Sequence, residues 1–293
     1  MTNGVATTAH PIERVGVVGS GAMGAGIVEL CAVRGLDVRL AVSRESSLTS
    51  APQRIAASLN RRVAKQKLTE DERDAALARI SLTTDLADLG DRQLVIEAVP
   101  EDESIKLDLF ATLDKVLEPD AILASTTSAI TITKLARATT RPQRVLGIHF
   151  FNPVVAMPLV ELVPTLLTDQ DVSRRAESFI ADTLDRRPLP TQDRSGFVVN
   201  ALLVPYLLSA IRMVESGFSS AELVDQGMEL GCAHPMGPLR LCDMIGLDVV
   251  AAAADALYGE FKEPLYTPPP LLSRMVESGF LGRKSGRGFY DYA

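Results

Sequence analysis

Residues 15–24 read V-G-V-V-G-S-G-A-M-G, an apolar run that leads directly into the pattern G-x-G-x-x-G. The pattern alone is weak, because any glycine-rich turn can produce it. Here it follows a predicted strand and opens an apolar helical stretch, a context typical of dinucleotide-binding turns. Gly19 suits the tight turn, Gly21 lets the backbone approach a pyrophosphate, and Gly24 lets helix and strand pack closely. The helix that begins here offers free N–H groups to phosphate oxygens. The predicted cofactor contacts in this turn are Gly19, Gly21, Ala22, Met23 and Gly24.

Short apolar runs alternate with helical stretches from residue 15 to about residue 163, and this alternation is the signature of an α/β fold. Runs typical of strands buried on both faces of a mostly parallel sheet lie at 15–18, 38–42, 94–99, 122–124 and 145–150, with a further apolar run at 159–163. Helices are predicted at about 22–34, 46–66, 70–79, 103–117 and 131–139. After Asp169 helical periodicity dominates, and Pro188 and Pro190 interrupt regular structure. We therefore predict a Rossmann-type, doubly wound, mostly parallel sheet in a domain over 12–187, followed by a smaller all-α domain over 188–293.

One heptapeptide, R-M-V-E-S-G-F, occurs at 212–218 and again at 274–280. Each copy is typical of a helix end with the glycine in a left-handed conformation just after the last turn. We give the repeat a structural meaning only.

Composition narrows the classes of function. The 293 residues carry a net charge of −7, and the pI is about 5.1, which argues against a general affinity for nucleic acid. Three cysteines without C-x-x-C spacing indicate neither a disulfide framework nor a metal site, so a reducing cytoplasm is the expected compartment. The first eleven residues lack the apolar core of a secretory signal. The apolar run over 196–214 contains Asn200, Pro205 and Arg212, so we expect a buried helix there and no membrane span.

The end of the second predicted strand lacks an expected carboxylate. NAD enzymes usually carry an acidic residue there, which binds the ribose 2′-hydroxyl. Residues 38–44 read V-R-L-A-V-S-R, so Val42 or Ser43 takes that position and Glu45 comes slightly late. A missing carboxylate beside Arg44 suits a 2′-phosphate, so NAD and NADP both remain open. Ser43 and Arg44 are the predicted cofactor contacts, and the alternative for Arg44 is an ordinary solvated loop residue.

A histidine and a glutamate occupy neighbouring apolar strands. His149 lies at the carboxyl end of one predicted strand, the edge where ligands gather in open α/β sheets. Glu161 lies inside the next apolar run, where a carboxylate is costly unless it is paired. The turn around Asn152-Pro153 would bring the second strand back beside the first. A carboxylate on one imidazole nitrogen fixes the tautomer, so His149 would be positioned as a general base.

Together these stretches resemble the short-chain 3-hydroxyacyl-CoA dehydrogenase family, and the 3-hydroxybutyryl-CoA dehydrogenases in particular. The resemblance runs from about Arg14 to Tyr290. The motifs that carry it are 19–24, L-V-I-E-A-V at 94–99, S-T-T-S at 125–128, H-F-F-N-P at 149–153, L-V-E at 159–161, G-F-V-V-N at 196–200, 234–239 and L-G-R-K-S-G-R-G-F-Y at 281–290. Two departures within these motifs stand out, Thr126 in place of asparagine and Ala129 in place of serine.

The resemblance implies a role for several residues. His149 matches the catalytic base and Glu161 its partner, while Ser128 and Asn200 match polar residues that hydrogen-bond the substrate. From the residues alone, Ser128 also suits an ST-turn and Asn200 a helix N-terminus. Four further residues match cofactor-contacting positions of the family: Glu101, Lys106, Asn152 and Lys284. The resemblance favours NAD as the cofactor, whereas Val42, Ser43 and Arg44 suit NADP.

The basic run R-R-V-A-K-Q-K at 61–67 resembles the helical region where the family meets CoA. Arg61 and Lys65 lie four residues apart, on one helix face, and are the predicted contacts to CoA phosphates. A solvated helix face is the alternative.

The expected reaction is the interconversion of (S)-3-hydroxyacyl-CoA, with short chains such as 3-hydroxybutyryl-CoA, and 3-oxoacyl-CoA in fatty-acid metabolism, by a homodimer. Two alternatives stay open. One is a dehydrogenase of a carrier-protein thioester or a free hydroxy acid. The other is a dinucleotide-binding structural or regulatory protein without turnover.

Overall fold

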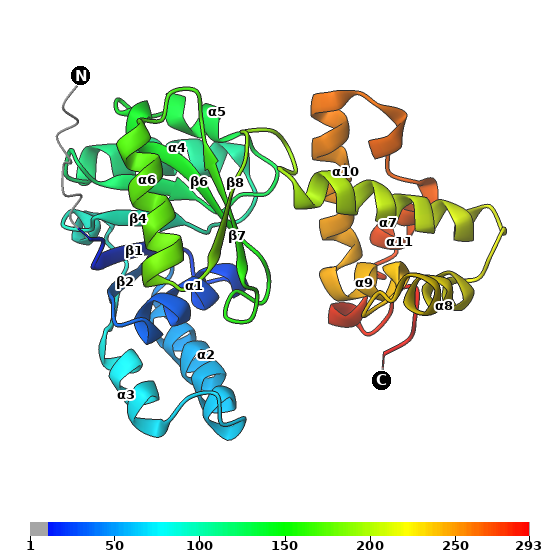
Figure 1. Ribbon diagram of the computed structural model, residues 1–293, viewed down its shortest axis with the longest axis horizontal. Helices are drawn as coiled ribbons and strands as arrows, with labels where there is room; N and C mark the ends of the chain where they lie inside the picture. The colour runs from blue at the N-terminus through cyan, green and yellow to red at the C-terminus, as the bar shows by residue number, and fades with distance from the viewer. Residues whose placement is uncertain (1–10, 293) are drawn as a thin grey trace, which may run out of the picture. The chain divides into compact units, whose positions relative to one another are not determined.

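The computed structural model describes residues 11–292, which form two compact units that divide between Asp193 and Arg194. The first is the α/β unit and the second is the helical unit (Figure 1). The expectation for the N-terminal residues falls mostly on 1–10, outside the described range.

The α/β unit is built on an eight-stranded sheet with the order β3-β2-β1-β4-β5-β6-β7-β8. All neighbouring strands are parallel except β6 and β7, which are antiparallel. The first six strands have the order of a Rossmann fold, whose switch point lies between β1 and β4. The predicted fold class is confirmed. The strands are β1 (Arg14–Val18), β2 (Asp37–Ala41), β3 (Ile80–Thr83), β4 (Leu94–Glu97), β5 (Ile122–Ser125), β6 (Val145–Phe150), β7 (Leu159–Pro164) and β8 (Arg187–Pro190).

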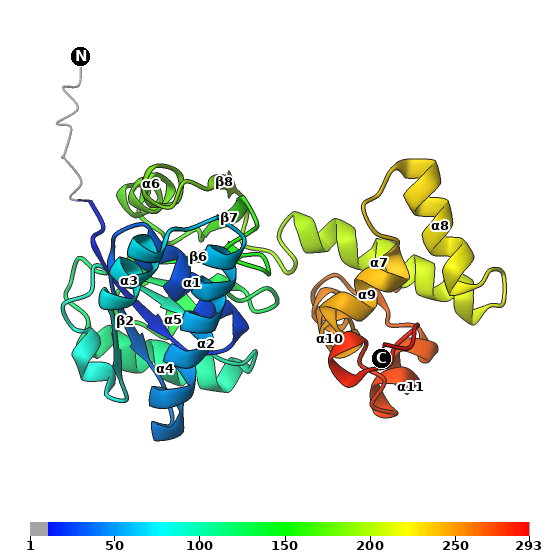
Figure 2. The same cartoon turned by 90° about the horizontal axis from the view of Figure 1, so that it is seen from below.

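Helices cover both faces of this sheet, as the views in Figures 1 and 2 show. Alternate strand residues, such as Val15 and Val17 of β1, join one buried cluster with the apolar sides of α1, α2, α3 and α6. Helices α4 and α5 contact each other; α4 also contacts β5, and α5 also contacts β6. Strands covered on both faces must be apolar throughout, which explains the continuous apolar runs in the sequence. The helices of this unit are α1 (Ala22–Val33), α2 (Glu45–Ala64), α3 (Glu70–Ala78), α4 (Glu103–Val116), α5 (Ile132–Arg137), α6 (Gln170–Ser178) and the short turns η1 (Leu86–Leu89), η2 (Pro142–Arg144) and η3 (Phe179–Thr183).

The helical unit has a core of its own, formed mainly by apolar residues of α7, α9 and α10. Both copies of the repeated heptapeptide end a helix as predicted. Gly217 and Gly279 have φ angles of +70° and +76°, and the N–H of the following phenylalanine donates to the carbonyl of Met213 or Met275. This is the hydrogen-bond pattern of a Schellman motif. The helices are α7 (Val199–Glu215), α8 (Ala221–Cys232), α9 (Pro238–Ile245), α10 (Leu247–Phe261) and α11 (Pro270–Glu277), with short turns η4 (Pro264–Tyr266) and η5 (Arg283–Ser285).

The structure differs from the sequence expectation at the domain boundary. We expected the first domain to end at residue 187, but the α/β unit continues to Asp193. The reason is β8, which pairs in parallel with β7 through Arg187–Pro190. Pro188 and Pro190 do not break regular structure, because proline is tolerated on the outermost strand of a sheet. Strand β3 at the opposite edge was also missed.

Candidate active site

The turn between β1 and α1 has the geometry that a bound pyrophosphate requires. Gly19 has a φ of +105°, and its N–H donates to the carbonyl of Ala41 over 2.9 Å. A Cβ at Gly24 would lie 1.9 Å from the carbonyl oxygen of Gly19, so the close packing expected of Gly24 is confirmed. A Cβ at Gly21 would meet nothing within 4 Å, so this glycine faces open space. Helix α1 begins there without a side-chain cap and without an acidic residue in its first turn, which favours an anion.

A cavity of about 440 Å³ opens at this turn, beside the switch point of the sheet. It is lined by Gly19, Ser20, Gly21, Ala22, Met23, Ser43, Arg44, Ser47, Ala98, Val99 and Pro100. Six of the predicted cofactor residues therefore line one cavity, while Gly24 packs behind them. The sequence prediction did not include Ser47, nor the three residues directly after β4, Ala98, Val99 and Pro100. Because β4 lies next to β1 in the order of a Rossmann sheet, residues 98–100 could have been predicted to lie beside the glycine turn.

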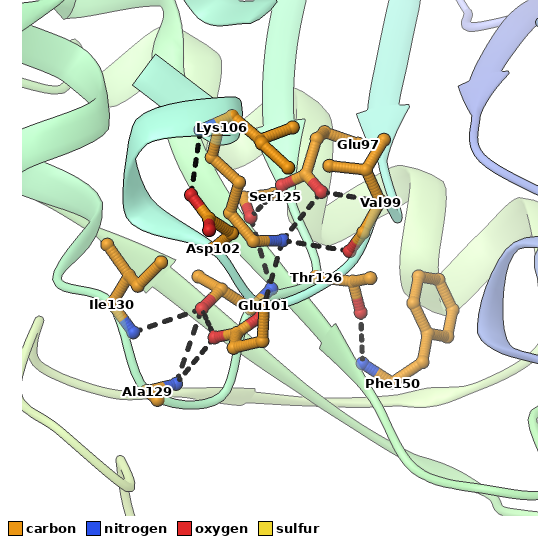
Figure 3. Close-up of polar contacts among 12 residues, drawn as sticks. Glu97, Val99, Glu101, Asp102, Lys106, Ser125, Thr126, Ala129, Ile130 and Phe150 are labelled. Carbon is orange, nitrogen blue, oxygen red and sulfur yellow. Dashed lines mark hydrogen bonds and ion pairs between the residues drawn. The ribbon is translucent and has the colours of Figure 1, made fainter. Parts of the chain in front are cut away.

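Lys106 and Glu97 form a buried ion pair next to the loop that follows β4 (Figure 3). The ammonium of Lys106 on α4 lies 2.6 Å from Oε1 of Glu97 and donates to the carbonyl oxygen of Val99 over 3.3 Å. The second carboxylate oxygen of Glu97 accepts a 2.6 Å hydrogen bond from the hydroxyl of Ser125. These contacts join β4, α4 and β5. Lys106 is thus held within the protein, with Glu101 as its more exposed neighbour at 3.3 Å.

The loop after β5, which carries Ser128, is fixed on both sides of that residue. The carboxylate of Glu101 accepts hydrogen bonds from the hydroxyl of Thr127 and from the N–H of Ala129. Thr126, which replaces the family's asparagine, accepts a 3.3 Å hydrogen bond from the N–H of Phe150 (Figure 3). This contact ties the Ser128 loop to the residue that follows His149 on β6.

The expected histidine–glutamate pair is present. His149 and Glu161 are directly opposite each other in the antiparallel pairing of β6 and β7. Nδ1 of His149 lies 2.7 Å from Oε2 of Glu161, and both residues are buried. Phe151 packs edge-on against the imidazole ring with a centroid distance of 4.8 Å. The ring is therefore held at one nitrogen by the carboxylate and at its side by an aromatic residue.

The remaining predicted residues belong to other elements of the two units. Asn152 is exposed and precedes a cis peptide bond to Pro153, just after β6. Arg61 and Lys65 are exposed at the C-terminal end of α2, next to a separate cavity of about 430 Å³. In the helical unit, Asn200 is half-buried in the first turn of α7, and the ammonium of Lys284 contacts the carboxylate of Asp248 at 2.5 and 2.6 Å.

Two family models together match nearly the whole chain. The model of the 3-hydroxyacyl-CoA dehydrogenase NAD binding domain matches residues 14–194, and that of the C-terminal domain matches residues 196–292. The chain belongs to the 3-hydroxyacyl-CoA dehydrogenase family. It is thus an oxidoreductase with a dinucleotide-binding Rossmann domain, as the resemblance in the sequence implied.

Individual members of the family are similar over almost their full lengths. The 3-hydroxybutyryl-CoA dehydrogenase of Mycobacterium tuberculosis is 58% identical over 96% of this chain and 99% of that protein. The mitochondrial hydroxyacyl-coenzyme A dehydrogenase of Sus scrofa is 40% identical, over 96% of this chain and 91% of its own. Among solved structures, M. tuberculosis FadB2 superposes with a TM-score of 0.96 at 58% identity, covering 97% of this chain and 100% of that one. The (S)-3-hydroxybutyryl-CoA dehydrogenase PaaH1 of Ralstonia eutropha gives 0.91 at 43% identity, covering 96% and 99%.

Within residues 11–292, none of the helices combines the length and the apolar character needed to cross a membrane.

Proposed function

We propose that this member of the family interconverts (S)-3-hydroxybutyryl-CoA and acetoacetyl-CoA. The substrate is the one in the names of the 58% and 43% identical relatives. The observation that carries the proposal is the buried His149–Glu161 pair, which lies at the same sheet edge as the dinucleotide cavity. When bound, the nicotinamide ring supplies hydride acceptance or donation at the C3 carbon of the substrate.

In the oxidative direction the hydroxyl proton of the substrate passes to Nε2 of His149. The Nδ1 nitrogen faces Glu161 at 2.7 Å, so it carries the hydrogen, and Nε2 is the nitrogen that accepts the proton. The carboxylate then stabilises the imidazolium that forms. In the reductive direction the same nitrogen returns the proton to the new alkoxide oxygen.

Ser128 and Asn200 are proposed to hydrogen-bond the substrate oxygen that becomes the ketone, a task of positioning and polarisation. The Glu101 contacts on either side of Ser128 support this, because they fix the backbone of its loop. Arg61 and Lys65 are proposed to meet the phosphates of CoA. Glu101, Asn152, Lys106 and Lys284 are proposed to contact or support the cofactor; for Lys106 the support runs through Glu101, since its ammonium is buried.

The proposed assembly is a homodimer in the cytoplasm. Large apolar side chains are exposed on α7, on α8 and in the turn between these helices: Leu202, Phe218, Leu223 and Leu230. Apolar surface of this kind is typical of interfaces between subunits.

The test is the initial rate of acetoacetyl-CoA reduction with NADH and with NADPH, for wild type and His149→Ala. We expect turnover with at least one cofactor, and a loss of about 10²- to 10⁴-fold in kcat in the variant, the range for a general base. His234→Ala, which removes a histidine of the helical unit that contacts Tyr206, is the matched control and should keep most of its activity.

Other outcomes would redirect the assignment. Turnover of carrier-protein thioesters or free hydroxy acids, with none of CoA thioesters, would favour another dehydrogenase. Tight dinucleotide binding without turnover of any of these substrates would favour a structural or regulatory protein.

A further inference from the structure

The position after β2 carries no carboxylate for an adenosine ribose. Val42, the first residue beyond the strand, is 5% exposed, and its N–H donates to the carbonyl of Thr83 over 2.9 Å. Its side chain belongs to the apolar core of the α/β unit. A ribose 2′-hydroxyl at this end of the cavity therefore has no acidic acceptor in the place where NAD enzymes usually supply one.

The cavity itself is cationic. None of its eleven lining residues is acidic, one is an arginine, and three carry hydroxyl groups: Ser20, Ser43 and Ser47. Arg44 is exposed, and its guanidinium makes no hydrogen bond or ion pair within residues 11–292. The carboxylate nearest in sequence, Glu45, is exposed and does not line the cavity.

Helix α2 adds to the positive potential at the same place. It begins at Glu45, directly after Arg44; no side chain caps its first N–H groups, and Glu45, which is exposed, is the acidic residue of its first turn. The positive end of the helix dipole thus lies beside Ser43 and Ser47. About two and a half turns after the start of α2, Arg54 donates to the carbonyl oxygen of Ser20 in the glycine turn, which places a second guanidinium against the cavity rim.

We propose that Arg44, together with the hydroxyls of Ser43 and Ser47, binds the 2′-phosphate of NADP, so that this chain prefers NADP(H) to NAD(H). The proposal rests on the proposed function for the identity of the ligand as a nicotinamide dinucleotide. Arginine is suited to the role because its planar guanidinium binds phosphate oxygens in a bidentate manner. The family model is described as NAD binding, so the preference belongs to residues 42–47 of this chain.

Binding can be measured without catalysis, with two nucleotides that differ only in the 2′-phosphate. Isothermal titration calorimetry with adenosine 2′,5′-bisphosphate and with 5′-AMP should show tighter binding of the bisphosphate by about 10- to 100-fold, the range for one or two charge-assisted hydrogen bonds. NADP⁺ and NAD⁺ should show the same order. Arg44→Ala should abolish most of this difference and leave the affinity for 5′-AMP unchanged.

Two further variants sharpen the test. Arg174→Ala removes an exposed arginine of α6 and should leave the preference intact, which separates a local contact from net charge. Ser43→Asp introduces a carboxylate at an exposed position without disturbing the core, and it should reverse the preference toward NAD⁺.

The proposal would be overturned if adenosine 2′,5′-bisphosphate and 5′-AMP bound with equal affinity, or if NAD⁺ bound more tightly than NADP⁺. An equal loss for both nucleotides in Arg44→Ala would also overturn it, because the arginine would then act on a phosphate that they share. A preference for NAD⁺ accompanied by turnover of acetoacetyl-CoA would leave the proposed function standing. A preference for NADP⁺ without turnover of acetoacetyl-CoA would support the proposed role of Arg44 and contradict the proposed function.

Discussion

Lys106 and Glu97 form an ion pair of 2.6 Å in which the two side chains are 1% and 0% exposed. The pair connects α4 to the last residue of β4, immediately before the loop that lines the dinucleotide cavity. Its position explains how a loop at the edge of the sheet is held firmly enough to position Glu101 and, through it, the Ser128 loop.

Removing one partner of this pair should destabilise the protein far more than removing both. Lys106→Met leaves the carboxylate of Glu97 buried without its cation, which costs about 3–5 kcal/mol in the free energy of unfolding. Combining it with Glu97→Gln removes the uncompensated charge and should restore part of that loss. Urea denaturation of wild type, both single variants and the double variant gives the coupling energy. Additive losses would show that the two side chains do not stabilise the fold as a pair.

Two of the three glycines in the turn between β1 and α1, Gly24 and Gly21, should have separate effects, one on folding and the other on dinucleotide binding. Gly24→Ala places a Cβ 1.9 Å from the carbonyl oxygen of Gly19, so α1 must move away from β1 and the melting temperature should fall by several degrees. Gly21→Ala meets no atom within 4 Å and has an ordinary φ of −62°, so the stability should be unchanged. Its methyl group points into open space at the cavity and should weaken dinucleotide binding by about 10-fold or more.

Thermal melting and calorimetric titration with NAD⁺ or NADP⁺ check both statements. Unchanged binding by a well-folded Gly21→Ala variant would place the pyrophosphate elsewhere.

Much of the fold and part of the site could be predicted from the sequence. Strands buried on both faces are apolar throughout, so β1, β4 and β6 stood out as runs. The glutamate within the run at 159–163 required a partner, and the turn after His149 supplied one by register alone. In both cases the requirement that a buried residue be apolar or paired was enough to predict the structure.

The features that were not predicted, β3, β8 and the burial of Lys106, have no clear signal in the local sequence. Ile80–Thr83 forms an outer strand with only Thr83 buried, so β3 lacks the apolar run of a central strand. Strand β8 contains two prolines, which locally argue against a strand. The burial of Lys106 was not predicted, because nothing in the local pattern shows that the chain turns and places Glu97, nine residues earlier, beside it.

The three cysteines should differ sharply in reactivity. Cys31 and Cys242 are buried, and burial raises the pKa of the Cys31 thiol to about 12 and that of Cys242 further still. Cys232 is exposed at the end of α8. Because the thiolate is the reactive form, Ellman's reagent should titrate one thiol rapidly in native protein and three after denaturation. Cys232→Ser should abolish the rapid phase. Rapid reaction of a second thiol would mean that a core cluster opens on the timescale of the assay.

Asp114 should make the stability of the α/β unit depend on pH below neutrality. Its side chain is 6% exposed. Burial acts to raise the pKa of its carboxyl, but hydrogen bonds from the N–H and hydroxyl of Thr140, both 2.7 Å, and from Arg141 at 3.0 Å outweigh burial and hold the pKa below its usual value. A carboxyl whose pKa is lower in the folded state stabilises the fold above its unfolded pKa of about 3.9. That contribution is lost as the pH falls through the folded-state pKa.

Asp114→Asn removes the charge but keeps the size, and it should cost about 1.5–3 kcal/mol at pH 7, the range for hydrogen bonds to a charged group. The difference from wild type should stay constant between about pH 6 and 8 and shrink below about pH 4, since both proteins are then neutral at this position. Denaturant titrations across that range measure it. Asp120→Asn is the matched control, because Asp120 pairs with Arg144 at 3.3 Å on the surface, where an ion pair contributes about 0–1 kcal/mol. If the difference in the free energy of unfolding between Asp114→Asn and wild type stayed the same in acid, the charge of the Asp114 carboxylate would not be what stabilises its contacts with Thr140 and Arg141.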